Sequence, residues 1–347
     1  MATISDVAAK AGVSTATVSR ALNGKSTVDP QLVARVRTAV DELGYQPNGL
    51  ARNLRRQETA VLALIISDVE NPFFTAIARG VEDVAQTAGY SVVLCNSDEK
   101  PDKERRYLDV ALQERVAGVV LCPAGTATGV ELLRQRGTPV VAVDRPLPGE
   151  PGDQVLVNTR LAAREATTHL LDAGYRRVGC VTGPSGIRTA DERLAGYRDA
   201  LGAAGMAPTS APFRHAEYHR ADGARAAAVE LLDLAEPPDA LLIANSAMAI
   251  GVLEALAGRG LRPGRDIGVV AFDDPPWATL IDPPLSVVAQ PTYQIGSAAA
   301  ELLLARIGDP DRPPVTRTLA AQLIPRGSSR GGRHREVTGG SRSPGSR

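Results

Sequence analysis

Residues 3–24 read TISDVAAKAGVSTATVSRALNG. Thr3 and Asp6 have the spacing of a helix capping box, and apolar residues then recur at helical intervals until Gly12. Ser14 is a second capping residue and predicts a further helix that ends near the Asn-Gly pair. Two short helices joined by a turn with a glycine are typical of the helix-turn-helix motif.

A third helix is predicted from Asp29, which is followed by Pro30 in the manner of an N-cap with proline at the first helical position. It ends at Gly44 and carries one apolar stripe, made of Leu32, Val36, Val40 and Leu43. A generic three-helix bundle has the same pattern. The helix-turn-helix is favoured because the outward face of the second helix is small and polar, which suits the ~12 Å wide major groove of DNA. That face contains Thr15, Ala16, Thr17, Ser19 and Arg20.

Residues 45–57, YQPNGLARNLRRQ, form a different unit. Pro47 ends the preceding structure, and Asn48 is a capping residue for a helix of two turns. Two turns fall short of the ~12 residues that an isolated helix needs, and Gly49 lowers helix stability further. We therefore expect this hinge segment to become helical only on DNA, which its three arginines (Arg52, Arg55 and Arg56) would contact.

The formal net charge is zero, but it is unevenly distributed. Residues 1–57 hold eight basic and four acidic residues, and residues 326–347 hold six basic residues and one acidic residue. The intervening residues 58–325 hold 25 basic and 34 acidic residues. A basic N-terminal module on an acidic body favours a polyanionic partner for that module. Residues 327–347 are rich in Gly, Ser and Arg and are predicted to be a disordered basic tail.

No apolar run approaches the ~20 residues that cross a membrane, and the first residues do not resemble a secretory signal. Cys95, Cys122 and Cys180 lie far apart in strand-like stretches without metal-ligand spacing. We interpret them as reduced thiols in the core of a cytoplasmic protein.

From residue 58 onward the pattern alternates between strands and helices. Strands are expected at 61–67, 91–97, 116–123, 139–146, 177–184, 240–245 and 267–274, and helices at 75–90, 102–115, 159–173, 190–204, 221–235 and 247–258. Such alternation predicts parallel sheets with helices on both faces. The stretch is too long for one open sheet, which indicates two lobes.

Several segments together resemble the LacI/GalR family of bacterial transcription regulators over residues 2–326. They are TISDVAAKAGVSTATVSRALNG, GYQPNGLARNL, SDVENPFF, RLAGYRDAL, IANSAMAIG, VVAFDD and PPLSVVAQP. The resemblance implies an all-α helix-turn-helix headpiece and an α/β two-lobed effector domain similar to periplasmic binding proteins. It also implies a homodimer on a near-palindromic operator, with a small sugar-like effector between the lobes.

The resemblance also implies domain boundaries. The headpiece would comprise residues 1–46, the hinge helix 47–57 and the effector-binding and dimerisation domain 58–326. Three chain crossovers near residues 157, 288 and 318 would divide that domain into an N-lobe (61–157 and 289–317) and a C-lobe (158–288 and 318–326).

In DNA recognition, the resemblance assigns base reading to Thr15, Ala16 and Arg20. Arginine pairs with both acceptors of guanine, whereas the two short side chains offer a hydroxyl or a methyl contact. Phosphate contacts, which position the protein, would come from Thr17, Ser19 and Asn23. In the hinge, Asn48 and Arg52 are further DNA-binding positions. Leu54 matches a leucine that wedges into the minor groove, although packing between two hinge helices also accounts for it.

The effector-binding positions of the family fall at the ends of predicted strands, where open α/β sheets bind ligands. They are Ser67, Asp68, Phe73, Phe74, Asp144, Arg193, Tyr218, Asn245, Asp273 and Gln290. Carboxylates that accept from hydroxyls, an arginine fork and aromatic faces suit a hydroxylated ligand.

Simpler interpretations of these residues stay open at this level. Asp144 and Asp273 are also suited to capping helices or turns, and Tyr218 to the surface. Arg193 could pair in solvent with Asp191 or Glu192.

Two positions depart from the family pattern. Asn245 is followed by Ser246 instead of an aspartate, which removes a carboxylate from the cleft rim, and Gly49 weakens the hinge helix. Trp277, the single tryptophan, is expected near the cleft mouth, either in the pocket or in lobe packing.

Two other classes of protein fit less well. An enzyme is disfavoured because GxSxG, Walker, GxGxxG and HExxH motifs are absent, so we expect no catalytic residue, cofactor or metal. A transporter's solute-binding protein would share the lobes but would need a signal peptide and no basic headpiece. Within the regulator class, an inducer is favoured over a corepressor or activator role.

Overall fold

The computed structural model describes residues 2–22, 28–45, 59–125, 129–147, 149, 152–207, 211–217 and 221–331. The chain divides into two compact units, Met1–Thr59 and Ala60–Arg347.

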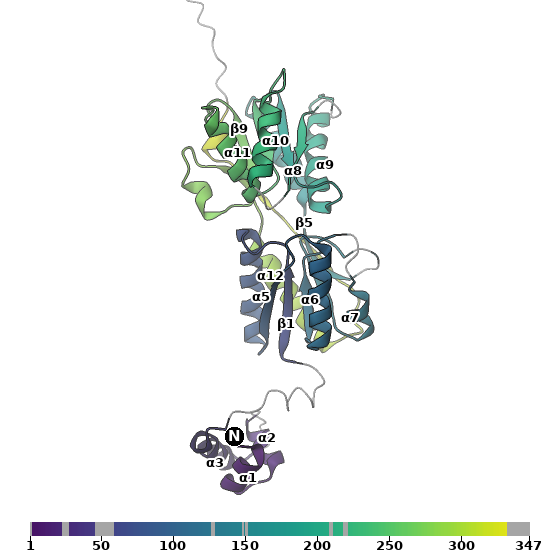
Figure 1. The fold of residues 1–347 in the computed structure, drawn as a ribbon, viewed down its shortest axis with the longest axis vertical. Helices are drawn as coiled ribbons and strands as arrows, with labels where there is room; N and C mark the ends of the chain where they lie inside the picture. Colours follow the sequence, from purple (N-terminus) through teal and green to yellow (C-terminus); the bar gives the residue numbers. More distant parts are fainter. Residues whose placement is uncertain are drawn as a thin grey trace, which may run out of the picture. The chain divides into compact units, whose positions relative to one another are not determined.

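The N-terminal unit contains α1 (Ile4–Ala11), α2 (Thr15–Leu22) and α3 (Pro30–Leu43) (Figure 1). The predicted capping box is present, since the Asp6 N–H donates to Thr3 Oγ1 at 3.3 Å and the Thr3 N–H donates to the Asp6 carboxylate at 2.8 Å. Gly12 ends α1 in the left-handed region, at a φ of 64°. Small side chains make the core: Val7, Ala8, Ala11, Val18, Ala21, Val36 and Ala39.

The second unit holds two sheets that, in the described part of the chain, have six strands each. The first has the order β11-β5-β4-β3-β1-β2 with every neighbouring pair parallel, and the second has the order β12-β10-β9-β8-β6-β7 with only β12 antiparallel. The first sheet consists of β1 (Val61–Ile66), β2 (Ser91–Asn96), β3 (Gly118–Leu121), β4 (Val140–Val143), β5 (Asp153–Val157) and β11 (Thr316–Leu319). The second consists of β6 (Val178–Thr182), β7 (Phe213–His215), β8 (Ala240–Ile243), β9 (Gly268–Phe272), β10 (Ser286–Ala289) and β12 (Gln322–Ile324).

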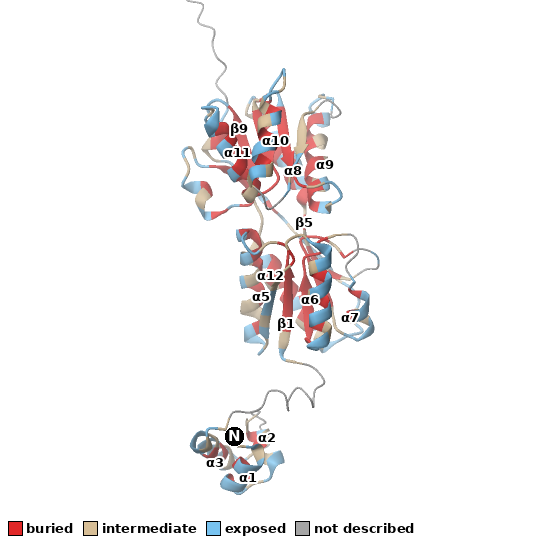
Figure 2. Ribbon diagram, viewed as in Figure 1, coloured by how far each residue is buried: buried red, intermediate tan, exposed pale blue. Residues whose placement is uncertain are grey.

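Helices cover both faces of each sheet, and we call each covered sheet a lobe (Figures 1 and 2). The first lobe carries α5 (Pro72–Thr87), α6 (Pro101–Gln113), α7 (Glu131–Gln135) and α12 (Thr292–Gly308). The second carries α8 (Thr159–Asp172), α9 (Arg188–Ala203), α10 (Ala221–Leu232), α11 (Ser246–Gly258) and the short 3₁₀ helices η2 (Pro276–Thr279) and η3 (Gly327–Ser329).

Alternate residues of β1 explain this layering. Leu62, Leu64 and Ile66 pack on one face in the cluster that includes α5 and α12, whereas Ala63 and Ile65 pack on the other face with α6 and α7. Side chains of a strand alternate between faces, so a strand covered on both sides must be apolar throughout. This accounts for the continuous apolar run that the sequence shows here.

The chain passes between the lobes after β5, after β10 and after β11. The third crossing differs from the expected position, because Thr318 and Leu319 still pair with Leu156 and Val157 of the first sheet. The crossing therefore lies at residues 320–321, so the position near residue 318 that the resemblance implied is too early by two to three residues. Pairing with β5 holds this strand in register two residues further than predicted.

The prediction that disorder begins at residue 327 is also wrong. Ser328 and Ser329 in η3 are fully buried. Ser328 Oγ donates to the Val269 carbonyl and accepts from the Ser286 N–H, both at 2.7 Å. These bonds anchor the segment because each satisfies a backbone group that is buried in the sheet. Residues 332–347 lie outside the described residues.

Candidate DNA interface and ligand cleft

The outward face of α2 presents the residues predicted to read bases. Thr15, Ala16 and Arg20 are exposed, while Val18 and Ala21 on the opposite face are buried in the headpiece core. Ser14 caps the helix, since its hydroxyl accepts from the Thr17 N–H at 3.1 Å and lies 2.9 Å from Thr17 Oγ1. A capped helix with an exposed arginine and small neighbours has the dimensions and donors for the major groove.

Of the remaining predicted DNA-contacting residues, two lie on α2 and the others lie outside the described residues. Thr17 and Ser19 are half-buried on α2. Asn23, Asn48, Arg52 and Leu54 lie outside the described residues, as does the whole of the predicted hinge helix, residues 47–57.

In the body, the loops that follow the strands of both sheets meet in a cleft between the lobes. Eight of the ten predicted effector residues line it. The complete lining is Asp68, Asn71, Phe73, Phe74, Glu99, Asp144, Arg145, Thr189, Arg193, Asn245, Asp273 and Gln290. Of the other two, Ser67 is buried and its hydroxyl donates to Cys122 Sγ at 3.2 Å instead of facing the cleft, and Tyr218 lies outside the described residues.

The centre of the cleft is narrow, with a volume of about 30 Å³. It continues on one side into a hollow of about 470 Å³ that also borders Asp144 and Thr189. A further hollow of about 220 Å³, the outer hollow, borders Asp68, Asn71 and Trp277. A ligand larger than a water molecule therefore reaches the centre only if the facing side chains or the lobes move apart.

The first-lobe wall is held by a buried ion pair. The Arg145 guanidinium donates to both carboxylate oxygens of Glu99 at 2.6 Å and to the Pro123 carbonyl at 3.0 Å. Arg145 thus joins the loops that follow β2, β3 and β4. Asp144 beside it has a φ of 64°, and burial raises the pKa of its carboxyl although Arg145 and Arg193 oppose the shift.

Glu104 on α6 is a second buried carboxyl of this lobe. Its carboxylate accepts from the Ala124 N–H at 2.6 Å, which fixes the loop after β3. Desolvation raises the pKa of Glu104 to about 7, against the lowering effects of that hydrogen bond and of Arg145.

The second-lobe wall is organised by Asp273, whose φ is 71°. One carboxylate oxygen accepts from Gln290 Nε2 at 2.7 Å, and the other accepts from the Ser246 N–H and hydroxyl at 3.2 and 3.4 Å. Asn245 completes the start of α11 by accepting from the Met248 N–H at 2.7 Å. Asp273 therefore both helps to cap α11 and lines the cleft, whereas the Asp144 carboxylate accepts from no helix terminus in the described chain.

Arg193 is buried, so the simpler interpretation, in which it pairs in solvent with Asp191 or Glu192, is wrong. Its guanidinium lies 4.4 Å from the centre of the Phe272 ring and donates to the Ala244 carbonyl at 2.5 Å. Glu192 instead accepts from Arg188.

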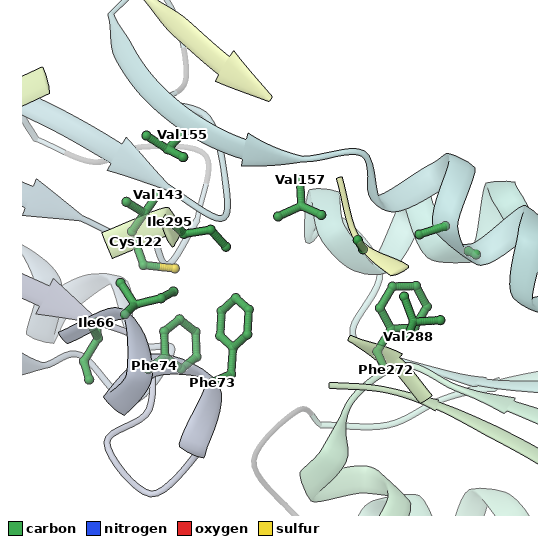
Figure 3. Close-up of a cluster of buried hydrophobic side chains, with 14 of the residues drawn as sticks. Ile66, Phe73, Phe74, Cys122, Val143, Val155, Val157, Phe272, Val288 and Ile295 are labelled. Atoms are coloured by element: carbon green, nitrogen blue, oxygen red, sulfur yellow. The ribbon is translucent and has the colours of Figure 1, made fainter. Parts of the chain in front are cut away.

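Aromatic rings lie on both sides of the cleft, and two of them, Phe73 and Phe74, line it. In Figure 3, Phe73 and Phe74 lie on the first-lobe side and Phe272 on the second-lobe side, with Val157 of the crossing chain between them. The Phe73 and Phe74 rings are 4.9 Å apart and almost perpendicular. Trp277 is half-buried and packs on the second-lobe core. It also borders the outer hollow, so it combines packing with pocket lining, the two roles expected of it.

Four cleft residues were missed by the sequence analysis: Asn71, Glu99, Arg145 and Thr189. Their position was a usable signal, since Glu99 and Arg145 come directly after strands whose carboxyl ends share one edge of the sheet. The ion pair between them was not predictable from spacing, because 46 positions separate the two residues.

Within the described residues, no cluster of His, Cys, Asp or Glu is suited to a metal ion. The helices of that same part of the chain include none long and apolar enough to cross a membrane. None of the three cysteines, all of which the structure describes, is in a disulfide.

A helix-turn-helix headpiece joined to a two-lobed body with a polar cleft defines a class of DNA-binding proteins that respond to small ligands. Residues 3–48 match the model of "Bacterial regulatory proteins, lacI family", and residues 167–329 match that of a "Periplasmic binding protein-like domain". The second match extends through Ser329, in agreement with the burial of that residue.

The whole chain has similar relatives. The ribose operon repressor of Halalkalibacterium halodurans is 35% identical over 97% of this chain and 99% of its own length. The ribose operon repressor of Escherichia coli is 35% identical over 95% of this chain and 100% of its own length. The structure of a "transcriptional regulator CelR-cellobiose complex" is 33% identical over 94% of this chain and all of its own, with a TM-score of 0.72. The structure of the lac repressor dimer bound to operator and an anti-inducer is 25% identical over 94% of this chain and 99% of its own, with a TM-score of 0.84. The chain belongs to the LacI family of bacterial transcription regulators.

Proposed function

We propose that the protein is a repressor that binds a palindromic operator as a homodimer and is released by a small sugar bound between the lobes. The names of the relatives support this proposal, since two are ribose operon repressors and one structural neighbour is a complex with cellobiose. D-ribose is accordingly the first effector to test. We further propose that the protein acts in the cytoplasm and catalyses no reaction, in line with relatives that are repressors.

One observation in the cleft carries the effector proposal. Gln290 Oε1 is buried and has no hydrogen-bond partner among the described residues, while Gln290 Nε2 is occupied by Asp273. A buried acceptor without a partner costs about 1–3 kcal/mol. A ligand hydroxyl that donates to Gln290 Oε1 removes this cost, so the site favours a hydroxylated ligand over an apolar one.

The charges around the cleft disfavour an anionic ligand. Four carboxylates (Asp68, Glu99, Asp144 and Asp273) line it with two guanidiniums, and Arg145 is already paired with Glu99. An anionic ligand would be repelled by this excess of negative charge. We assign ligand binding to Asp68, Phe73, Phe74, Asp144, Arg193, Asn245, Asp273 and Gln290, with Tyr218 as an additional candidate; Ser67 has a supporting role behind the wall.

For DNA, we assign base reading to Thr15, Ala16 and Arg20, and phosphate contacts to Thr17 and Ser19. Asn23, Asn48 and Arg52 are proposed to contact DNA, and Leu54 to enter the minor groove. The exposure of Thr15, Ala16 and Arg20 on one capped helix supports these roles.

A homodimer is supported by the edge of the first sheet. β2 is an edge strand, and its Val93 and Leu94 side chains are 51% and 44% exposed. Natural proteins rarely leave an apolar edge strand uncovered, because it promotes pairing with another chain. A second copy would cover it and place two headpieces on the two halves of a palindrome.

The effector proposal is tested by titrating D-ribose into a complex of the full chain and its operator. Ribose should lower operator affinity by about 5- to 150-fold, the range of a typical coupling free energy. Arg193→Gln should abolish this response while operator affinity without ribose stays within a few-fold. Tighter DNA binding with ribose would instead identify a corepressor, and an unchanged response in the Arg193 variant would place the ligand elsewhere.

The DNA interface is tested by Arg20→Ala. This change should weaken operator binding by about 1–3 kcal/mol and relax the preference at one base pair in each half-site. Arg37→Ala, which removes the same charge from the exposed face of α3, is the matched control and should not change the base preference. Equal losses on operator and random DNA in the Arg20 variant would contradict base reading.

A further inference from the structure

The C-terminal segment, residues 326–331, reaches the loop that carries Asp273. The Arg326 guanidinium donates to both carboxylate oxygens of Asp274 at 2.7 Å and to the Leu285 carbonyl at 3.1 Å. Only 16% of the Arg326 side chain and 30% of the Asp274 side chain are exposed. Bidentate arginine–carboxylate pairs fix orientation as well as distance.

The loop that this ion pair holds has an uncommon backbone. Asp273 has a φ of 71°, in the region where a side chain costs about 1–2 kcal/mol. The Asp273 carboxylate is bound on its cleft side by Ser246 and Gln290. Arg326 holds the next residue, Asp274, so two sets of hydrogen bonds fix the turn, one at each of its two aspartates.

The rest of the C-terminal segment keeps Arg326 in place. The Arg326 N–H donates to Ser286 Oγ, and Ser286 Oγ also lies 2.7 Å from Ser329 Oγ. Ser329 Oγ in turn lies 2.7 Å from His169 Nε2 on α8. The guanidinium therefore projects from a backbone that is bound to β10 through Ser286 and to α8 through His169.

We propose that Arg326 is a positioning residue of the effector cleft, which holds the Asp273–Asp274 turn so that the Asp273 carboxylate meets the ligand in a fixed orientation. Arg326 does not line the cleft and acts through Asp274. The inference rests on the proposed function, because it assumes that a ligand is bound at Asp273.

Trp277 reports on this turn without any ligand. It lies in η2, three residues after Asp274, and borders the outer hollow with Asn71 and Ser246. It is the single tryptophan of the chain, so fluorescence reads this loop alone. In the ligand-free full chain, Arg326→Gln should shift the emission of Trp277 and raise its quenching by acrylamide.

Two controls separate positioning from general stability. Ser329→Ala removes hydrogen bonds from the same segment but leaves the Arg326–Asp274 pair, and Arg259→Ala breaks an ion pair with Asp233 elsewhere in the second lobe. Well below the melting temperatures, Arg259→Ala should leave the Trp277 signal unchanged, and Ser329→Ala should change it less than Arg326→Gln does. Arg326→Lys keeps the positive charge but loses the two-pronged guanidinium, so its Trp277 signal should lie between those of wild type and Arg326→Gln.

Calorimetric titration with D-ribose then tests the cleft. Arg326→Gln should weaken ribose binding by about 10-fold, by analogy with groups that orient metal ligands. In an Asp273→Ala background the same substitution should cause no further loss, because the residue through which Arg326 acts is gone. Its effect on the unfolding midpoint should persist in that background.

The outcomes distinguish the two proposals. If wild type does not bind ribose, the ribose effector is wrong, and the Trp277 signal still decides whether Arg326 holds the turn. If Arg326→Gln leaves both the Trp277 signal and ribose affinity unchanged, the positioning role is wrong. Additive losses with Asp273→Ala would likewise overturn it.

Discussion

The two lobes are built from sheets of the same size, but their cleft walls are stabilised by different means. In the first lobe, the Glu99–Arg145 pair and the Glu104–Ala124 bond join neighbouring loops from within the lobe. In the second, hydroxyls of the C-terminal segment fill the space beside β9 and β10, and Arg326 holds the loop after β9.

This difference follows from the path of the chain. The first sheet is entirely parallel, and its wall is completed by loops that lie close in space. The second sheet ends in the antiparallel strand β12, which carries the chain directly into η3. We infer that one wall depends on buried charge and the other on the integrity of the chain's end, and three predictions test this contrast.

The largest effect is expected from truncation. Removing residues 327–347 eliminates the Ser328 and Ser329 side chains and leaves the Ser286 N–H and the Val269 carbonyl without their partners. At about 1 kcal/mol for each of four hydrogen bonds, the free energy of unfolding should fall by about 4 kcal/mol. Removing only residues 332–347 should change it little. Urea denaturation of both forms measures the difference, and equal stability would contradict an anchoring role for η3.

A smaller loss is expected from Glu99→Ala in the first lobe. Arg145 would remain buried, with Asp144 and the Pro123 carbonyl beside it but without its main carboxylate partner. Removing one partner of a buried pair costs about 3–5 kcal/mol, and Asp144 should reduce the loss to about 3 kcal/mol. Glu301→Ala, which breaks an exposed pair with Arg317 in the same lobe, is the control and should cost under about 1 kcal/mol. Similar losses in the two variants would show that burial of the pair is unimportant.

The smallest effect is a dependence on pH. The Glu104 pKa of about 7 exceeds its ordinary value of 4.5, so between these values the folded state binds a proton that the unfolded state has released. Stability should therefore fall as pH rises from about 4.5 to 7. Glu104→Gln, which mimics the protonated form, should match wild type at pH 5 and be more stable by about 1–2 kcal/mol at pH 8. Chemical denaturation at both pH values tests this, and a constant difference between the two proteins would exclude Glu104 as the titrating group.

The elements that the sequence predicted best are those with local signals. The capping box of α1, the Asp29-Pro30 start of α3 and the apolar run of β1 each depend on residues within a few positions of one another. α12 and β5 were not predicted. α12 is buried against α5 and the sheet, so its apolar residues form no single stripe, and β5 is only five residues long.

The residues of the candidate site likewise divide into those that the sequence located correctly and those whose orientation only the structure shows. The family resemblance located Asp144, Arg193, Asp273 and Gln290, and all four line the cleft. It also included Ser67, which points into the first lobe to Cys122. Which way a side chain turns at a strand end depends on the neighbouring strand, and no local pattern encodes it.

The amino-acid sequence by itself determined the helix-turn-helix, the alternation of strands and helices, the charge asymmetry and the family. These properties depend on capping, periodicity and composition, which act over a few residues. Only the tertiary structure decided that Glu99 pairs with Arg145, that Arg326 holds Asp274 and that Ser328 and Ser329 are buried. Such contacts join residues that are tens of positions apart, and they form because packing of the complete sheets brings polar groups together where water is excluded.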